Sequence, residues 1–307
     1  MTTPLDYPLT FKKIIPEFNQ SRHDDWFEKL PQLSLQAIGL TKYDIKQQLP
    51  SAQTDCLTQL IKAVLREQIY PTSITLPANF TIPLWKQKRL LMIQDLHPTS
   101  LGQFRHSGQV ILAADHIHHK EVIDNPNTLL KILVCELEKN DPKGEKFFHQ
   151  ELKDSIRNQA LALAYRKNWR QNLRNDMNEA GDKNFWHWNT ERLSASDLSI
   201  FWEQWGCVGH PFHPNKKSKI GLQPVDVLKL SPDFEAEVSI RLAAIKNNEV
   251  HTESSQGLTA TQWFSHNFPT WYQAWCEELQ QRGFNCNEYT PIPVHPWQAD
   301  NILPSLF

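Results

Sequence analysis

The stretch GHPFHPNKKSKIG, residues 209–221, is the densest cluster of polar and conformationally restricted residues in the chain. His210 and His213 each precede a proline, which drives the backbone of both histidines toward an extended conformation. Three lysines follow within a few positions: Lys216, Lys217 and Lys219. A stiff loop with two imidazoles and three ammonium groups predicts a site for a ligand with several carboxylates or phosphates, because charge-assisted hydrogen bonds to anions are strong. Taken alone, the stretch is equally compatible with a solvated basic loop whose histidines satisfy nearby carbonyls.

A second His-Pro pair occurs in PIPVHPWQ, residues 291–298. His295 and Gln298 follow an expected strand, so both side chains could face a ligand where the strand ends. The alternative is that Trp297 anchors the chain in the core and His295 caps the strand. This stretch by itself favours the alternative.

Length and composition restrict the class of protein. The chain has 307 residues, which suggests about two domains, and its 40% hydrophobic residues are enough to build a core. The net charge of -2 argues against a nucleic-acid or membrane-surface binder. Only 10 glycines are present, and neither a dinucleotide-binding nor a P-loop glycine motif occurs. The zincin and serine-hydrolase motifs are missing as well.

The ends of the sequence and its cysteines indicate a compartment. The N-terminal MTTPLDYPLTFKK lacks the pattern of a secretory signal, and the apolar runs are too short to span a bilayer. The 5 cysteines are widely spaced and form no metal-like pairs. We therefore expect buried thiols in a reducing cytoplasm.

Hydrophobic periodicity predicts an α+β fold with a boundary near Asp182. In residues 1–181 we expect mainly helices, with only two strands. The expected helices are 51–69, one capped by Thr128, and 145–180, and the strands are 89–96 and 109–114. In residues 182–307 we expect an antiparallel α+β region. Its expected helices are 194–205 and 270–281, and its strands are 225–230, 234–245 and 289–294.

A histidine tract, residues 116–119, follows the apolar run VILAAD. His116 and His118 would share one face of a strand and could bind a metal together with Asp115, whereas His119 would point away. Satisfied or exposed histidines are the favoured interpretation of so short a tract.

Taken together, the two His-Pro segments are far more specific than either one alone. They resemble the IucA/IucC family of siderophore synthetases, which work without a peptide-synthetase assembly line. Members of this family carry a glutamate six residues before a Gly-His-Pro-x-His-Pro-x-x-Lys-x-Arg-x-Gly signature. The matching residues are Glu203, Gly209, His210, His213, Lys217 and Gly221.

Three further elements of the family are matched. Ser231 to Phe234 resembles its Ser-Pro-Glu-Phe element with Asp233 as a conservative change, and His295 to Gln298 matches its His-Pro-Trp-Gln element in full. The stretch ELKDSIRNQ supplies Ser155 and Asn158 of an upstream helical motif. The resemblance is strong from about Phe147 onward and faint over the first 140 residues, which would correspond to a variable thumb-like region.

The sequence departs from the family in two places. Lys219 replaces an arginine, which keeps the charge but loses the planar fork that grips a carboxylate through two nitrogens. A Ser-x-Arg-Thr element and a whole palm-like domain, expected after His-Pro-Trp-Gln, are not found before Phe307. The chain therefore resembles the N-terminal half of a synthetase, a helical thumb-like region followed by an antiparallel fingers-like region. We expect this part alone to be inactive.

The resemblance implies an enzyme of siderophore biosynthesis, an ATP- and Mg²⁺-dependent ligase that forms homodimers when full length. It would activate citrate or a related dicarboxylic acid as an acyl-adenylate, which an amine, hydroxyl or hydroxamate substrate then attacks. The implied ATP- and carboxylate-binding residues are His210, His213, Lys217, Lys219, His295 and Gln298. The implied supporting residues are Glu203, Gly209, Gly221 and Ser231.

Two other hypotheses remain open at this point. One is a catalytically inactive remnant or partner subunit that binds a carboxylate, and the other is a histidine-based metal-binding module. Neither the acid, nor the amine, nor the siderophore product follows from the sequence.

Overall fold

The computed structural model describes residues 26–302, apart from residues 72, 76–78, 101–102, 115–119, 138–140, 183, 206–208, 220 and 256. Contacts divide the described chain into two compact units, residues 26–236 and 237–302. The boundary expected at Asp182 falls inside the first unit. There the residues after it fold back on the preceding helix, with Phe201 against Trp169 and Arg166 donating to the carbonyl of Gln204.

Two long helices form the framework of the first unit: α3 (Lys42–Arg66) and α5 (Pro142–Glu179). A capping box between Thr41 and Asp44 starts α3, and the Asp141 side chain accepts backbone N–H groups at the start of α5. These helices confirm the expected segments 51–69 and 145–180. The helix α3 begins earlier than expected because it continues through Pro50, a residue that normally ends a helix.

The first unit also contains the larger described sheet, antiparallel and ordered β1-β2-β3-β6-β7. Its strands are β1 (Ser73–Thr75), β2 (Asn79–Leu84), β3 (Arg89–Ile93), β6 (Val110–Ala114) and β7 (Lys120–Val122). The strands expected at 89–96 and 109–114 are confirmed as the paired β3 and β6. A separate ribbon pairs β4 (Leu96–Pro98) with β5 (Phe104–His106). The prediction of a mainly helical region therefore missed the strands β1, β2 and β7 of this sheet and the ribbon β4–β5.

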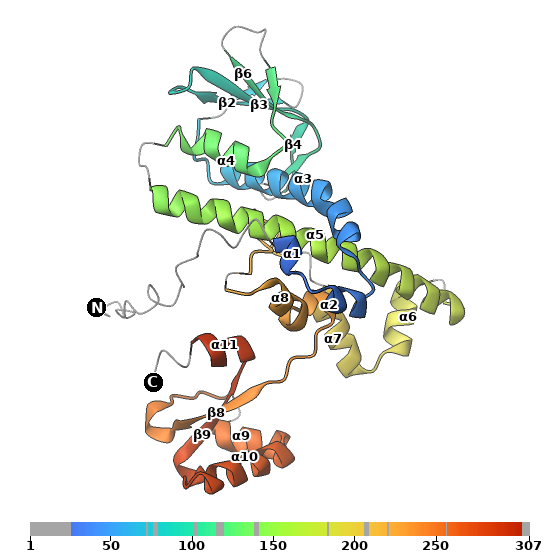
Figure 1. Ribbon diagram of the computed structural model, residues 1–307, viewed down its shortest axis with the longest axis vertical. Helices are drawn as coiled ribbons and strands as arrows, with labels where there is room; N and C mark the ends of the chain where they lie inside the picture. The colour runs from blue at the N-terminus through green and yellow to red at the C-terminus, as the bar shows by residue number, and fades with distance from the viewer. Residues whose placement is uncertain are drawn as a thin grey trace. The chain divides into compact units, whose positions relative to one another are not determined.

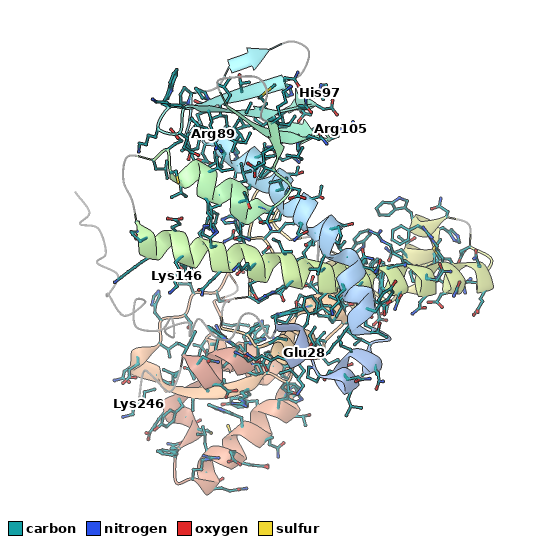
Figure 2. All side chains as sticks on the ribbon, turned by 45° about the horizontal axis from the view of Figure 1, so that its top comes forward. Glu28, Arg89, His97, Arg105, Lys146 and Lys246 are labelled. Atoms are coloured by element: carbon teal, nitrogen blue, oxygen red, sulfur yellow. The ribbon has the colours of Figure 1, made fainter. Side chains whose placement is uncertain are left out.

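The sheet and the helices form layers around one core. In Figure 1, α3 and α4 (Pro126–Val134) lie between the sheet and α5. Ile82 and Leu91 from the sheet, Leu130 from α4 and Leu161 from α5 belong to the same cluster of buried side chains. The side chains labelled on the strands in Figure 2, Arg89, His97 and Arg105, are exposed.

The remaining helices of the first unit are short. They are α1 (Trp26–Lys29), α2 (Gln32–Ala37), α6 (Phe185–Arg192), α7 (Ala195–Trp205), α8 (Pro224–Leu230) and the 3₁₀ turn η4 (Pro232–Phe234). The helix expected at 194–205 is confirmed. The strand expected at 225–230 is wrong, because this segment forms α8. Pro224 at its first turn and the backbone N–H of Gln223, which donates to Asp226, start a helix that buries Val227 and Leu228.

The second unit is a small α+β arrangement. Strand β8 (Arg241–Lys246) pairs antiparallel with β9 (Tyr289–Val294). The other elements are α9 (Ala260–Asn267), α10 (Pro269–Gln281), α11 (Pro296–Asn301) and the 3₁₀ turns η5 (Asn247–Glu249) and η6 (Cys286–Glu288). The expected helix 270–281 and strand 289–294 are confirmed. Of the expected strand 234–245, only the end pairs as a strand, in β8, and η4 with the left-handed Glu235 occupies its start.

The architecture is therefore α+β, as expected, with helices and antiparallel sheets in both units. The described helices include none that is long and apolar enough to cross a membrane.

A core substitution tests the layer made by α5. Leu161 is fully buried, so we expect Leu161→Ala to lower the free energy of unfolding by about 2–5 kcal/mol through lost burial and a residual cavity. The exposed Asn172→Ala on the same helix is the matched control and should change it by less than about 0.5 kcal/mol. Urea unfolding followed by tryptophan fluorescence measures both. Equal effects of the two substitutions would contradict the packing of α5.

Candidate functional site

The loop of residues 209–219 lies along one face of α5. The backbone N–H of Lys217 donates to Ser155 Oγ (3.1 Å), and Asn158 Nδ2 donates to the carbonyl of Lys217 (3.0 Å). Two positions further on, the N–H of Lys219 donates to Asp154 Oδ2 (2.8 Å). Residues three and four apart share a helix face, so this helical motif and the loop signature come together in space.

A buried ion pair lies under this loop. Lys217 Nζ is 2.5 Å from Asp233 Oδ1, and the two side chains are only 4% and 5% exposed. Ser231 Oγ donates to the other carboxylate oxygen (2.7 Å), and Lys219 Nζ lies 3.8 Å from that same oxygen. Asp233 therefore compensates Lys217 and also faces Lys219. At the sequence level Asp233 is only a conservative change in a motif, and nothing in the spacing identifies it as the counter-ion.

Two further acidic residues of α5 contact the loop. Asp154 accepts from Lys219 and from Asn158 Nδ2 (3.2 Å), and Glu151 accepts from Asn215 Nδ2 (2.8 Å). Burial raises the pKa of the Asp154 carboxyl, an effect that the Lys219 N–H partly offsets. Burial likewise raises the pKa of Glu151, and the hydrogen bond from Asn215 partly offsets this rise. Neither residue was expected at the site, although both belong to the stretch ELKDSIRNQ.

On its other side the loop contacts α3. Lys216 Nζ pairs with Asp55 Oδ2 (2.7 Å), and the Cys56 thiol donates to the carbonyl of Pro214 (3.4 Å). Burial raises the pKa of Cys56 to about 12, so this thiol stays protonated. The interpretation as a simple solvated basic loop is wrong, because Lys216 and Lys217 are paired and largely buried.

The two histidines of the loop remain open to solvent. His210 and His213 are exposed, their rings are 6.2 Å apart, and His210 Nδ1 accepts the N–H of Phe212 (3.3 Å). Their imidazoles are therefore available to a ligand. Glu203 is exposed on α7, and within the described residues no hydrogen bond joins it to the loop.

Glycines permit the turns at both ends of the loop. Gly209 has φ = 79°, and a Cβ there would lie 3.1 Å from the carbonyl oxygen of Lys216. Gly221 has φ = 84°. Such left-handed conformations strongly favour glycine, which explains these two signature positions.

The remaining expected residues lie in the second unit. His295 Nδ1 accepts the N–H of Trp297 (3.1 Å), and Gln298 Oε1 accepts the N–H of His295 (3.1 Å). This reciprocal pair is the capping box of α11, so His295 caps a helix rather than a strand.

In the first unit the structure thus places Lys217, Lys219 and Ser231 around Asp233, and the rings of His210 and His213 near each other. In the second unit His295 and Gln298 bond each other. The histidine tract at 116–119 and its Asp115 lie outside the described residues.

Known proteins resemble both the sequence and the fold. The sequence profile of the IucA / IucC family matches residues 198–307. The chain is 29% identical over 263 residues to an uncharacterised protein of Sinorhizobium fredii, which covers 83% of this chain and 42% of that protein. It is 22% identical over 300 residues to D-ornithine–citrate ligase of Staphylococcus aureus, covering 94% of this chain and 42% of the ligase.

Solved structures agree at the level of the fold. The petrobactin biosynthesis protein AsbB of Bacillus anthracis matches with a TM-score of 0.61 at 17% identity, over 85% of this chain and 40% of that one. ATP-bound aerobactin synthetase IucA of Klebsiella pneumoniae matches with a TM-score of 0.53 at 19% identity, over 82% of this chain and 40% of that one.

Over residues 198–307 the sequence is therefore similar to the IucA/IucC family, and the fold is similar to that of solved siderophore synthetases. The chain spans less than half the length of the relatives described above.

Removing the counter-ion tests the buried pair. Asp233→Asn leaves the Lys217 ammonium buried without a compensating charge, so we expect a loss of about 3–5 kcal/mol in the free energy of unfolding. Asp300→Asn breaks the exposed pair with Arg241 and should cost less than about 1 kcal/mol. Urea unfolding measures both, and an equally small loss at Asp233 would contradict the pairing.

The buried Asp154 carboxyl gives a pH prediction. Its pKa is raised in the folded state, so its favourable contribution is complete below the unfolded value near 3.8 and is lost as the pH rises through the folded pKa. We therefore expect the free energy of unfolding of the wild type, relative to that of Asp154→Asn, to fall as the pH rises from the unfolded pKa through the folded pKa of Asp154. Urea unfolding between about pH 4 and about pH 8 measures the difference. A difference that does not change with pH would contradict this environment, and the exposed Asp176→Asn is the matched control.

Proposed function

We propose that this chain is part of an ATP-dependent ligase of siderophore biosynthesis, which joins citrate or a related dicarboxylic acid to an amine, hydroxyl or hydroxamate. The observation that carries the proposal is the fixed position of the signature loop on α5. Ser155, Asn158 and Asp154 hold its backbone, while His210 and His213 remain exposed. Relatives support the substrate class, since one is named D-ornithine–citrate ligase and another staphyloferrin A synthase.

In the proposed reaction, a carboxylate oxygen of the acid attacks the α-phosphorus of ATP. The bond to the bridging oxygen of the β-phosphate breaks, and pyrophosphate leaves. The nucleophile then attacks the acyl carbon of the adenylate, AMP leaves, and the attacking group loses a proton. Two polyanions share the site in the first step, so cations must offset their repulsion and the charge that develops at phosphorus.

The burial of the lysines refines their roles. The side chain of Lys219 is 29% exposed, which leaves its ammonium able to meet a carboxylate or phosphate oxygen. Lys217 is buried against Asp233, so we propose that it stabilises the loop through this ion pair and does not contact the ligand. His210 and His213 would donate to the same anion. His295 and Gln298 keep their proposed ligand roles in the second unit, in addition to capping α11.

The resemblance also implies Mg²⁺ as a cofactor. Its preferred ligands are oxygens in an octahedral arrangement, often from phosphates and water. Among the described residues, no group of three or more His, Cys, Asp or Glu side chains could hold a metal ion. Asp154 and Asp233 already accept N–H groups or face ammonium groups. We therefore assign no step to a metal bound by these residues.

The family resemblance also implies a homodimer and a cytoplasmic location, and we retain both as part of the proposal.

A trapping assay tests the ligase. Acyl-adenylate is trapped with hydroxylamine while ATP-dependent pyrophosphate release is followed with citrate as the acid. The assay compares this chain with the complete product of its reading frame. We expect activity from the complete product, and in that context we expect Lys219→Ala to lower adenylation by about a hundredfold, as loss of a transition-state donor does.

Lys219→Arg is the matched variant, because it keeps the charge and adds the planar fork, and it should retain activity. Unchanged pyrophosphate release by Lys219→Ala would contradict the role of Lys219. Citrate binding without any pyrophosphate release by the complete product would instead favour an inactive carboxylate-binding subunit.

A further inference from the structure

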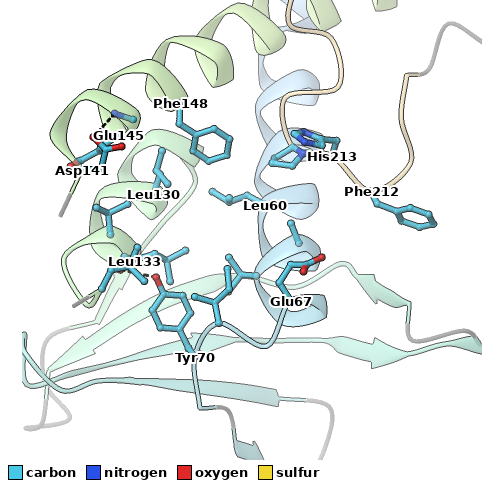
Figure 3. Close-up of a pocket in the computed structure, with 17 residues that line it drawn as sticks. Leu60, Glu67, Tyr70, Leu130, Leu133, Asp141, Glu145, Phe148, Phe212 and His213 are labelled. Atoms are coloured by element: carbon cyan, nitrogen blue, oxygen red, sulfur yellow. Dashed lines mark hydrogen bonds between the residues drawn. The ribbon is translucent and has the colours of Figure 1, made fainter. Parts of the chain in front are cut away.

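A groove with a volume of about 620 Å³ lies between α3, α4 and α5 in the first unit (Figure 3). Its walls are apolar side chains from all three helices: Leu60, Val64, Leu130, Leu133, Val134 and Phe148. Binding sites for small molecules have volumes of about 300–1,000 Å³ and are lined mostly by apolar groups with a few placed polar ones. The groove has the size and lining of such a site.

The polar groups that line the groove have one sign of charge. Glu67, Asp141 and Glu145 contribute carboxylates, and no lysine or arginine lines it within the described residues. Figure 3 shows Asp141 and Glu145 together at one end and Glu67 at the other, with Leu60, Leu130 and Leu133 between them. An apolar trough with a carboxylate at each end favours a ligand that carries a cation at each end of an alkyl chain.

One cation lies next to the groove, because the guanidinium carbon of Arg66 is 4.6 Å from the centre of the Phe212 ring, which lines it. Asp141 accepts backbone N–H groups at the start of α5, and Glu145 lies 3.6 Å from His149. Tyr70 donates its hydroxyl to the carbonyl of Leu133 (2.8 Å), and burial raises its pKa to about 12, so it stays neutral. The imidazole of His213 is the only basic side chain among the lining residues that the structure describes. Anionic ligands therefore meet repulsion from Asp141 and Glu145 at one end of the groove.

We propose that this groove binds a linear diamine, two ammonium groups joined by an alkyl chain. The methylenes would pack on the leucines and Phe148, and the two ammonium groups would meet Glu67 at one end and Asp141 with Glu145 at the other. Phe212, His213 and Pro214 also line the groove, so the diamine touches the signature loop. The proposal does not depend on the ligase reaction, because it concerns binding to the helical layer in the absence of ATP.

Calorimetric titration of this chain with matched six-carbon probes tests the proposal. The probes are 1,6-diaminohexane, hexylamine, 1,6-hexanediol and adipate, all without ATP or citrate. We expect the diamine to bind about fivefold more tightly than the monoamine, the gain typical of one partly exposed ion pair. We expect no binding of the diol or of adipate at the same concentrations. Equal binding of diol and diamine, or no binding of the diamine, would overturn the proposal.

Two variants locate the site. Glu67→Gln removes the carboxylate at one end without touching the core and should weaken diamine binding about fivefold while leaving hexylamine binding nearly unchanged. Glu179→Gln, at the exposed end of α5, is the matched control and should change neither. Equal weakening by both variants would show nonspecific attraction of cations and would overturn the site.

Ala63 lies on the groove and is half-buried, so Ala63→Trp should fill the groove and lower diamine affinity more than tenfold. Circular dichroism verifies that this variant folds. A folded Ala63→Trp variant with unchanged affinity would overturn the proposal as well.

Discussion

The buried ion pair between Lys217 and Asp233 is the constraint on which the signature loop depends. An ammonium group that is 4% exposed is tolerated only with a counter-charge, and Asp233 supplies it at 2.5 Å. Because Lys217 lies in the loop and Asp233 lies in η4, the pair ties the two segments together. Tyr165 and Trp169 of α5 donate to Glu235 at the end of η4, so the same helix supports both partners.

Helix α5 orients the rest of the loop. Its face of Glu151, Asp154, Ser155 and Asn158 satisfies backbone and side-chain groups of residues 215–219. The backbone of the loop is thus bonded to α5, while the side chains of His210 and His213 remain exposed. Preorganised donors of this kind stabilise anions at little cost in reorganisation.

Elements with strong periodicity were predictable from sequence, and elements decided by contacts were not. The face of α5, the pair β3–β6, the helix α10 and the strand β9 follow from apolar spacing. The segment 225–230 alternates like a strand, yet the cap of Asp226 and the burial of Val227 and Leu228 make it a helix. The helix α3 continues through Pro50 because packing on α5 and α4 outweighs the local penalty.

By itself the sequence determined the α+β class, the resemblance to the IucA/IucC family and the residues of the signature, because glycine, proline and histidine spacing act over a few neighbouring positions. Tertiary structure alone decided which of these residues face a ligand. Lys217 and Lys219 are close in the sequence, yet one is buried against Asp233 and the other is partly exposed. The charge partner of a lysine depends on which carboxylate the fold brings near, and Asp233 is 16 residues away in the chain. No local pattern encodes that distance.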